Sequence, residues 1–250
     1  MLRKILRRVV MGPSVAKRSK LDLARGLIGA KQYVLLHVGK TGGTSLRGAI
    51  SKMQSDGIDL PLVKLPHDVL LKDVRSVAPI AKIGFVYRDP MDRFVSAFDC
   101  RLRNGRPEYD VLWAPGEAAA FLYFQTANDL AEALSSSDQR LRSAAAFAMR
   151  TITHVRKGYE YCFGSLEELA ANKDRIFFMC DLKDLDDRVY ECFAPFNISS
   201  DTVDKYLKRR NKGTPDKTPL SDLAQRNLRA HWKTEFLFYE EFKRLDKARV

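Results

Sequence analysis

A short glycine-rich segment, GKTGGTS, has the residue types of an anion-binding loop. Its members are Gly39, Lys40, Thr41, Gly42, Gly43, Thr44 and Ser45. The two adjacent glycines allow a sharp turn and a close approach of the backbone to a ligand. The lysine supplies a mobile positive charge, and the three hydroxyl groups supply donors. If the loop joins a strand to a helix, the N–H groups of the helix N-terminus favour a bound anion. The segment therefore predicts a phosphate or sulfate site.

The order of residues in this segment differs from that of the loop that binds nucleoside triphosphates. In the latter, G-x-x-x-x-G-K-[ST], the lysine follows the glycines and directly precedes the hydroxyl that binds Mg²⁺. Here Lys40 precedes both glycines. An ATPase loop also needs an acidic metal partner, which the sequence does not place. A strand–turn–helix without a ligand stays open as an alternative.

A second segment, YRDPMDRFVSAF at residues 87–98, carries further groups that suit an anion. Arg88 lies at the carboxyl end of a predicted strand, and Ser96 follows eight residues later in the predicted helix. An arginine with a nearby hydroxyl suits a second phosphate. The alternative is a capped surface helix in which Arg88 or Arg93 makes an ordinary ion pair with a neighbouring aspartate.

The elements that position these groups follow from hydrophobic spacing. Short apolar, β-branched runs predict buried strands, at residues 31–38, 81–90 and 175–180. Apolar residues at helical spacing predict one helix that begins at Thr44 and another that begins at Pro90, with Asp89 as its cap. The same spacing predicts helical structure through most of 117–151, a helix at about 184–193, and one long helix from about 219. Residues 56–68 are predicted to be a connection. Alternating strands and helices predict an α/β fold, with a central parallel sheet flanked by helices.

Length and charge restrict the organisation and the partners. The 250 residues predict a basic N-terminal arm, 1–30, and one domain, 31–250. A net charge of +12 favours acidic partners: nucleotides, anionic glycans, a membrane surface or nucleic acid. Scattered cysteines and interrupted apolar runs predict a cytoplasmic protein with reduced thiols. The arm is expected to be frayed or packed; the alternative is a basic helix that associates with anionic lipid.

Together the two segments resemble those of a known enzyme family. HVGKTGGTSL resembles the 5′-phosphosulfate loop of sulfotransferases that use 3′-phosphoadenosine 5′-phosphosulfate (PAPS), and RDPMDRFVSAF resembles their 3′-phosphate element. The resemblance is closest to the carbohydrate sulfotransferase branch, although Gly39 stands where that branch often has Pro and Asp89 where Asn is common. Weaker similarity extends through residues 153–165, 175–189 and 211–215.

The resemblance implies a fold, a reaction and a set of ligands. The fold is the P-loop-containing nucleotide-binding fold of sulfotransferases. The reaction transfers the sulfuryl group of PAPS in line to a hydroxyl of a carbohydrate or glycolipid acceptor, leaves 3′,5′-adenosine bisphosphate (PAP) as product, and needs no metal. Residues 39–45 would hold the 5′-phosphosulfate, with Lys40 catalytic, and Arg88 and Ser96 would hold the 3′-phosphate.

A late basic loop in this family covers the adenosine phosphate, and the corresponding residues here would be Arg209, Arg210, Lys212 and Gly213. Solvated charge on an exposed loop is the alternative for each of them. The acceptor would contact Arg156, Tyr159 and Arg103, which lie near basic or aromatic neighbours in the sequence.

The acceptor hydroxyl needs a base, and a neutral histidine suits neutral pH. The chain has four histidines. His37 precedes the loop and is expected to orient it or to pack, and His231 is expected to be structural or on the surface. His67, between the two cofactor segments, is the first candidate for the base and His154 the second. A cap at a helix start is the alternative role for His67.

Two other functions stay open at this stage. A P-loop-like kinase would bind ATP with Mg²⁺. A basic nucleic-acid-binding protein would bind phosphates with an affinity that falls steeply with salt, but the aromatic residues lie mostly in apolar stripes rather than among the basic runs. We therefore expect no nucleic-acid partner.

Overall fold

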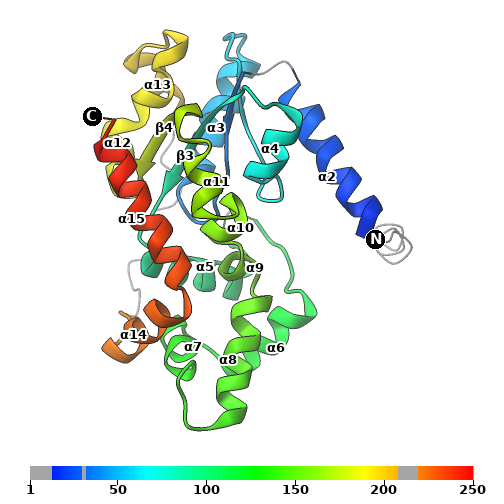
Figure 1. Ribbon diagram of the computed structural model, residues 1–250, viewed down its shortest axis with the longest axis vertical. Helices are drawn as coiled ribbons and strands as arrows, with labels where there is room; N and C mark the ends of the chain where they lie inside the picture. Colours follow the sequence, from blue (N-terminus) through cyan, green and yellow to red (C-terminus); the bar gives the residue numbers. More distant parts are fainter. Residues whose placement is uncertain (1–12, 30–31, 108, 208–218, 250) are drawn as a thin grey trace.

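Four parallel strands form the central sheet of the protein, which we describe from a computed structural model (Figure 1). The structure describes residues 13–29, 32–107, 109–207 and 219–249. The strands lie in the order β2-β1-β3-β4. Their bounds are β1 Tyr33–Leu35, β2 Leu62–Lys64, β3 Lys82–Tyr87 and β4 Ile176–Asp181. The predicted α/β architecture, a parallel sheet flanked by helices, is confirmed.

Strand β2 corrects the prediction for residues 56–68, which were expected to be only a connection. Its three residues pair in parallel with β1, from Tyr33 opposite Leu62 to Leu35 opposite Lys64. A strand of three residues is too short to show a periodic pattern, and it is defined here by its partner. Conversely, β1 is shorter than the predicted strand at 31–38.

Helices cover both faces of the sheet because successive strand residues point to opposite sides. Val34 and Phe85 pack on one face, whereas Leu35 and Val86 pack on the other. The first face is covered by α2 (Pro13–Ile28), α4 (Leu71–Val77), α10 (Tyr159–Phe163), α11 (Leu166–Ala170) and α15 (Lys233–Lys247). The second is covered by α3 (Gly43–Ser55), α12 (Leu185–Arg188), η3 (Val189–Cys192) and α13 (Ser200–Tyr206).

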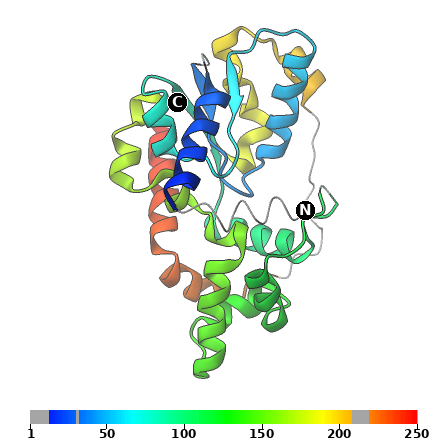
Figure 2. The same cartoon turned by 90° about the vertical axis from the view of Figure 1, so that its right-hand side faces the viewer.

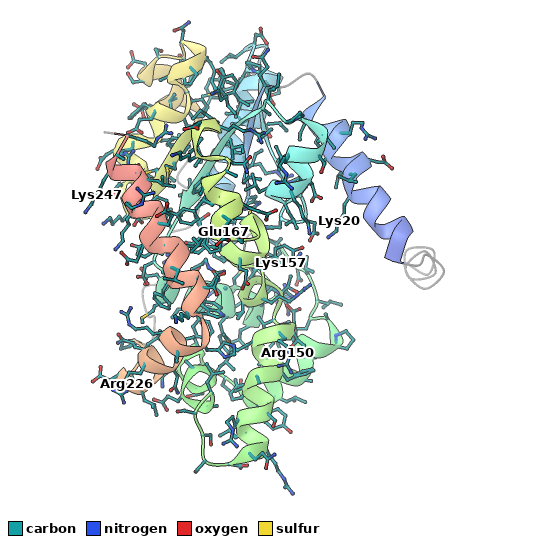
Figure 3. All side chains as sticks on the ribbon, in the orientation of Figure 1. Lys20, Arg150, Lys157, Glu167, Arg226 and Lys247 are labelled. Carbon is teal, nitrogen blue, oxygen red and sulfur yellow. The ribbon has the colours of Figure 1, made fainter. Side chains whose placement is uncertain are left out.

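A second, purely helical core lies beyond one end of the sheet (Figures 1 and 2). It is formed by α5 (Pro90–Leu102), α6 (Pro115–Tyr123), α7 (Ala127–Ala133), α8 (Gln139–Thr151), α9 (Thr153–Arg156) and α14 (Asp222–His231). Because β3 runs directly into α5, this helical half faces the carboxyl ends of the strands. Helix α15 extends from the helical half along the sheet and joins the two.

Several expected helices differ from the observed ones. The long final helix is two helices, α14 and α15, interrupted at Trp232, whose ring packs against Phe94 and Arg93. The helix expected at about 184–193 is a series of short turns that also includes η2 (Leu182–Asp184). Helix α5 begins as predicted, because the Asp89 carboxylate accepts hydrogen bonds from the N–H groups of Met91 and Asp92. The remaining turns are η1 (Lys173–Arg175) and η4 (Ala194–Phe196).

The N-terminal arm is partly a packed helix. Within α2, Ala24 and Ile28 are buried in the core on the α4 side of the sheet. Residues 1–12, for which lipid contact was the alternative, lie outside the described part of the chain. No described helix combines the length and the apolar composition needed to cross a membrane. All four cysteines are buried and free.

Candidate functional site

The strand order creates a switch point between β1 and β3. The chain leaves β1 through α3 toward β2, and then returns through α4 to β3 on the other side of β1. In parallel α/β sheets the carboxyl ends of the strands at such a switch point are where ligands commonly bind. The loop at residues 39–43 follows β1, and Arg88 follows β3. The sheet thus brings the two predicted segments to the same place.

The loop has a backbone that only particular residues tolerate. Lys40 and Gly42 both adopt left-handed conformations, with φ of 69° and 78°. At Gly42 an added Cβ would also overlap the side chain of Leu182, and at Gly43 it would lie 2.8–2.9 Å from His37 and Lys64. A lysine held at positive φ stores of the order of 1–3 kcal/mol of strain, as found at many ligand-binding loops.

Helix α3 begins directly after this turn, and no side chain caps it at Gly42. Its first N–H groups can therefore serve an anion, as the sequence predicted for the helix N-terminus. Thr41 differs from the prediction, because its side chain is buried and its hydroxyl donates to the Val38 carbonyl at 3.0 Å. That hydroxyl closes the turn, and its proton is engaged within the loop. Ser45 is half-buried in the first turn of α3, and the side chain of Thr44 lies outside the described part.

Arg88 reaches back to the loop. Its Nη1 lies 3.4 Å from the Lys40 carbonyl oxygen, and its side chain is only 16% exposed. Asp92, on the exposed side of α5, lies 3.9 Å from its Nη2. The two sequence segments are therefore in direct contact, through residues 48 positions apart. Ser96 lies further along α5 and is half-buried.

Three of the four histidines gather beside the loop. The rings of His37 and His67 are stacked with centroids 3.6 Å apart, and the ring of His154 lies 5.6 Å from that of His67. A Cβ on Gly39 would contact His67 at 3.6 Å and His154 at 3.9 Å, so the loop begins against both rings. The fourth histidine, His231, lies at the end of α14 in the helical half.

His67 has a defined tautomer. Its Nδ1 lies 3.0 Å from the His37 carbonyl oxygen, which can only accept a hydrogen bond. Nδ1 therefore carries the proton, and Nε2 keeps its lone pair. By contrast, Nδ1 of His154 is buried and has no hydrogen-bond partner among the described residues. The alternative role of His67 as a helix cap is not supported, since its ring bonds to the chain after β1 rather than to α4.

Burial keeps all three imidazoles neutral. It lowers the pKa of His67 to about 4, with Lys64 and Lys157 also contributing. It lowers the pKa of His154 to about 3, assisted by His67 and Lys40, and strongly lowers the pKa of His37 as well.

Lys64 is a site residue that sequence reasoning missed. It ends β2, and its Cε would lie 2.9 Å from a Cβ on Gly43, so its side chain crosses to the start of α3. Burial and the charge of Arg47 lower the pKa of Lys64 to about 7. The sequence gives no local pattern that places Lys64 at the site, because β2 is too short to be predicted as a strand.

A buried network holds His154 and Arg88 in place. The Arg93 guanidinium donates to the His154 carbonyl at 3.2 Å and to the Glu235 carboxylate at 3.1 Å. Glu235 also accepts from the N–H of Tyr159 at 2.8 Å, and the Tyr159 hydroxyl bonds to the backbone N–H and carbonyl of Arg88. Arg93 thus makes a buried ion pair across the helical layer, not the surface pair considered from the sequence.

This network corrects the role expected for Tyr159. The residue is fully buried, so it supports Arg88 and is not available to an acceptor. Arg156 is exposed and lines a pocket of about 110 Å³ together with Tyr161 and Trp232. Arg103 is exposed and donates to the Arg106 carbonyl at 3.3 Å. The late loop with Arg209, Arg210, Lys212 and Gly213 lies outside the described residues.

Two aspartates at the carboxyl ends of the strands have other partners. Asp89 caps α5, and Asp181 at the end of β4 accepts from the Lys183 N–H and the Tyr239 hydroxyl. Over the described ranges, no group of three or more His, Cys, Asp or Glu residues is placed to hold a metal ion.

Comparison with protein-family models, with curated proteins and with solved structures gives no match for this chain. The assignment of a function therefore rests on the geometry of the site and on the two sequence motifs.

Proposed function

We propose that the protein is a PAPS-dependent sulfotransferase with the P-loop-type fold of that family, acting on a hydroxyl of a carbohydrate-type acceptor. The observation that carries the proposal is the contact between Arg88 and the Lys40 carbonyl at the switch point of the sheet. The motifs that resemble the 5′-phosphosulfate loop and the 3′-phosphate element need to meet around one nucleotide. A donor with anionic groups at both ends explains two cationic positions on neighbouring strands.

The donor would be held by backbone and side chain together. Its 5′-phosphate would lie on the uncapped N-terminus of α3, where oriented N–H groups and the helix dipole favour negative charge. Its 3′-phosphate would bind Arg88, with Ser96 as the hydroxyl donor that the family resemblance implies. The left-handed turn at Lys40 and Gly42 shapes the loop before any ligand arrives, so little ordering is needed on binding.

His67 would act as the general base. Its Nδ1 proton is fixed on the His37 carbonyl, so Nε2 is free to accept the proton of the acceptor hydroxyl. A pKa of about 4 is low for a base at neutral pH. A bound donor with several negative charges would raise the pKa toward neutrality, so His67 would become an effective base only when the donor is present.

The transfer itself requires positioning and charge neutralisation. The acceptor oxygen forms a bond to sulfur as the bond between sulfur and the bridging phosphate oxygen breaks. The acceptor proton goes to His67, and the electron pair of the broken bond goes to the leaving phosphate. Lys40 would neutralise the charge that grows on this phosphate, which is the electrostatic stabilisation that catalyses such displacements.

A thermal unfolding experiment tests the proposal. We expect 3′,5′-adenosine bisphosphate without metal to raise the melting temperature, by about 5–10 °C at a hundredfold excess over Kd. Lys40→Ala and Arg88→Ala should each lose most of this shift. Lys52→Ala, which removes an exposed lysine on the far turns of α3, should keep it. Stabilisation by ATP with Mg²⁺ but not by the bisphosphate would indicate a kinase and refute the proposal.

The base is tested separately with radiolabelled PAPS and a panel of hydroxyl-bearing saccharides. His67→Asn should abolish sulfation of any accepted saccharide while leaving the bisphosphate shift within about 1 °C of wild type. Full activity of this variant would transfer the role to His154.

A further inference from the structure

Four basic side chains surround the loop at residues 39–43, which is proposed above to bind the donor and is called the donor loop from here on. His37 and Lys64 both reach Gly43 at the start of α3, and His67 and His154 both reach Gly39 at the other end of the loop. Each base comes from a different segment: the chain after β1, the end of β2, the turn before α4, and α9.

Most of the charged groups that act on these four basic side chains are themselves cationic. The positive charge of Arg47 on α3 lowers the pKa of Lys64, and among the described residues no carboxylate opposes it. His37 faces Lys64, His67, His154 and Arg47. The carboxylates that act on the cluster are Asp68, which acts on His67 and is itself paired with Lys157, and Glu117, which acts on His154 and is paired with Arg101. The positive charge of Lys40 also lowers the pKa of His154.

We propose that when an anion binds to this loop, the protein takes up a proton from solvent, chiefly on Lys64. The affinity for the donor therefore increases as the pH falls through the slightly alkaline range. This inference rests on the proposed donor, and it concerns how the same site is regulated. The physical reason is that this half-buried amine, beside a second cation, has no counter-charge among the residues that the structure describes. The anion becomes that counter-charge, and favours the protonated form.

The sign follows from the two states of the amine. In the empty protein, burial and Arg47 hold the pKa of Lys64 at about 7. In the complex the anion raises it. Between these two pKa values binding takes up a proton, and the affinity changes by up to tenfold for each pH unit. Below the lower value Lys64 is already charged, and its contribution to the pH dependence disappears.

Titration calorimetry at pH 8 in two buffers with different ionisation enthalpies measures the uptake directly. At this pH the phosphates of 3′,5′-adenosine bisphosphate are fully ionised, since their second pKa is about 6. We expect uptake of about one proton per bisphosphate bound. Inorganic pyrophosphate serves as a second probe, because it presents two phosphate groups without the nucleoside, and the Lys64→Met variant corrects for any proton that pyrophosphate itself exchanges.

Three variants assign the proton. Lys64→Met should abolish the uptake and weaken binding at pH 7 about tenfold or more. Lys64→Arg, which keeps a charge that does not titrate, should also abolish the uptake but retain tight binding at pH 9. Lys52→Met, a matched change on the exposed face of α3, should behave as wild type. Melting temperatures in the absence of ligand show whether each variant is folded.

The outcomes separate this inference from the proposed function. If wild type binds the bisphosphate with no buffer-dependent heat, or Lys64→Met keeps the full uptake, the inference is wrong and the proposed donor stands. If only pyrophosphate binds, and its proton uptake is lost in Lys64→Met, the inference stands and the proposed donor is wrong. If neither anion binds, both are wrong.

Discussion

Replacing Glu117 with Gln would leave the Arg101 guanidinium buried beside a neutral partner. The two side chains are 1% and 5% exposed and meet at 2.7 Å, in the helical half next to the histidine cluster. Glu117 also accepts from the backbone N–H of Thr153, at the start of α9, at 2.9 Å. The substitution therefore removes a charge that supports both Arg101 and the helix that carries His154.

The loss of folding free energy in Glu117→Gln can be worked out in two ways, which give similar values. Burial by itself would raise the pKa of Glu117, but the hydrogen bonds from Arg101, Thr153 and Ala114 lower it from 4.5 to about 2. A difference of about 2.5 pH units corresponds to about 3 kcal/mol of folding free energy. Breaking a buried ion pair by removing one partner costs about 3–5 kcal/mol in other proteins. We expect Glu117→Gln to lower the free energy of unfolding by about 3 kcal/mol at pH 7.

The pH dependence has a definite sign. Because the folded-state pKa is depressed, the stabilisation by Glu117 is complete above its unfolded pKa of about 4.5 and is lost as the pH falls through about 2. The difference between wild type and Glu117→Gln should therefore shrink by about 2 kcal/mol between pH 7 and pH 3.

Urea unfolding, followed by fluorescence and by circular dichroism, measures the effect. The matched control is Asp110→Asn, which breaks the Arg106–Asp110 pair at the same distance of 2.7 Å but with side chains 65% and 53% exposed. An exposed pair contributes little, so this control should change stability by less than about 1 kcal/mol. Equal effects of the two substitutions, or a Glu117→Gln protein as stable as wild type, would refute the reasoning from burial.

Two further predictions concern the donor loop and its support. Gly42→Ala should lower the free energy of unfolding by about 1–3 kcal/mol and abolish bisphosphate binding, because its φ of 78° and the Leu182 side chain both oppose a Cβ. The control is Gly57→Ala, at φ 85° with no atom within 4 Å of an added Cβ. It should show only the backbone effect and still bind the bisphosphate. Tyr159→Phe should weaken bisphosphate binding severalfold, since the Arg88 N–H loses its acceptor, and should cost about 1–3 kcal/mol in urea unfolding. Tyr161→Phe, which loses only a bond to exposed Asp68, should leave binding unchanged, and loss in both tyrosine variants would contradict the specific role of Tyr159.

Local signals in the sequence determined the parts of this protein that depend on neighbouring residues. The alternation of strands and helices, the turn into α3 and the cap of α5 by Asp89 were all predicted, because each is set by backbone preferences or hydrogen bonds within a few positions. The two motifs could be named as an anion loop and a second anion site for the same reason.

Tertiary structure decided which of these groups meet. Strand β2 exists because β1 pairs with it, and it delivers Lys64 to the loop. The burial of Tyr159 and the ion pair of Arg93 with Glu235 join residues 76 and 142 positions apart. The stacking of His37 on His67 likewise depends on where the chain returns to the sheet. Contacts between distant segments depend on strand order and layer packing, which no local pattern encodes.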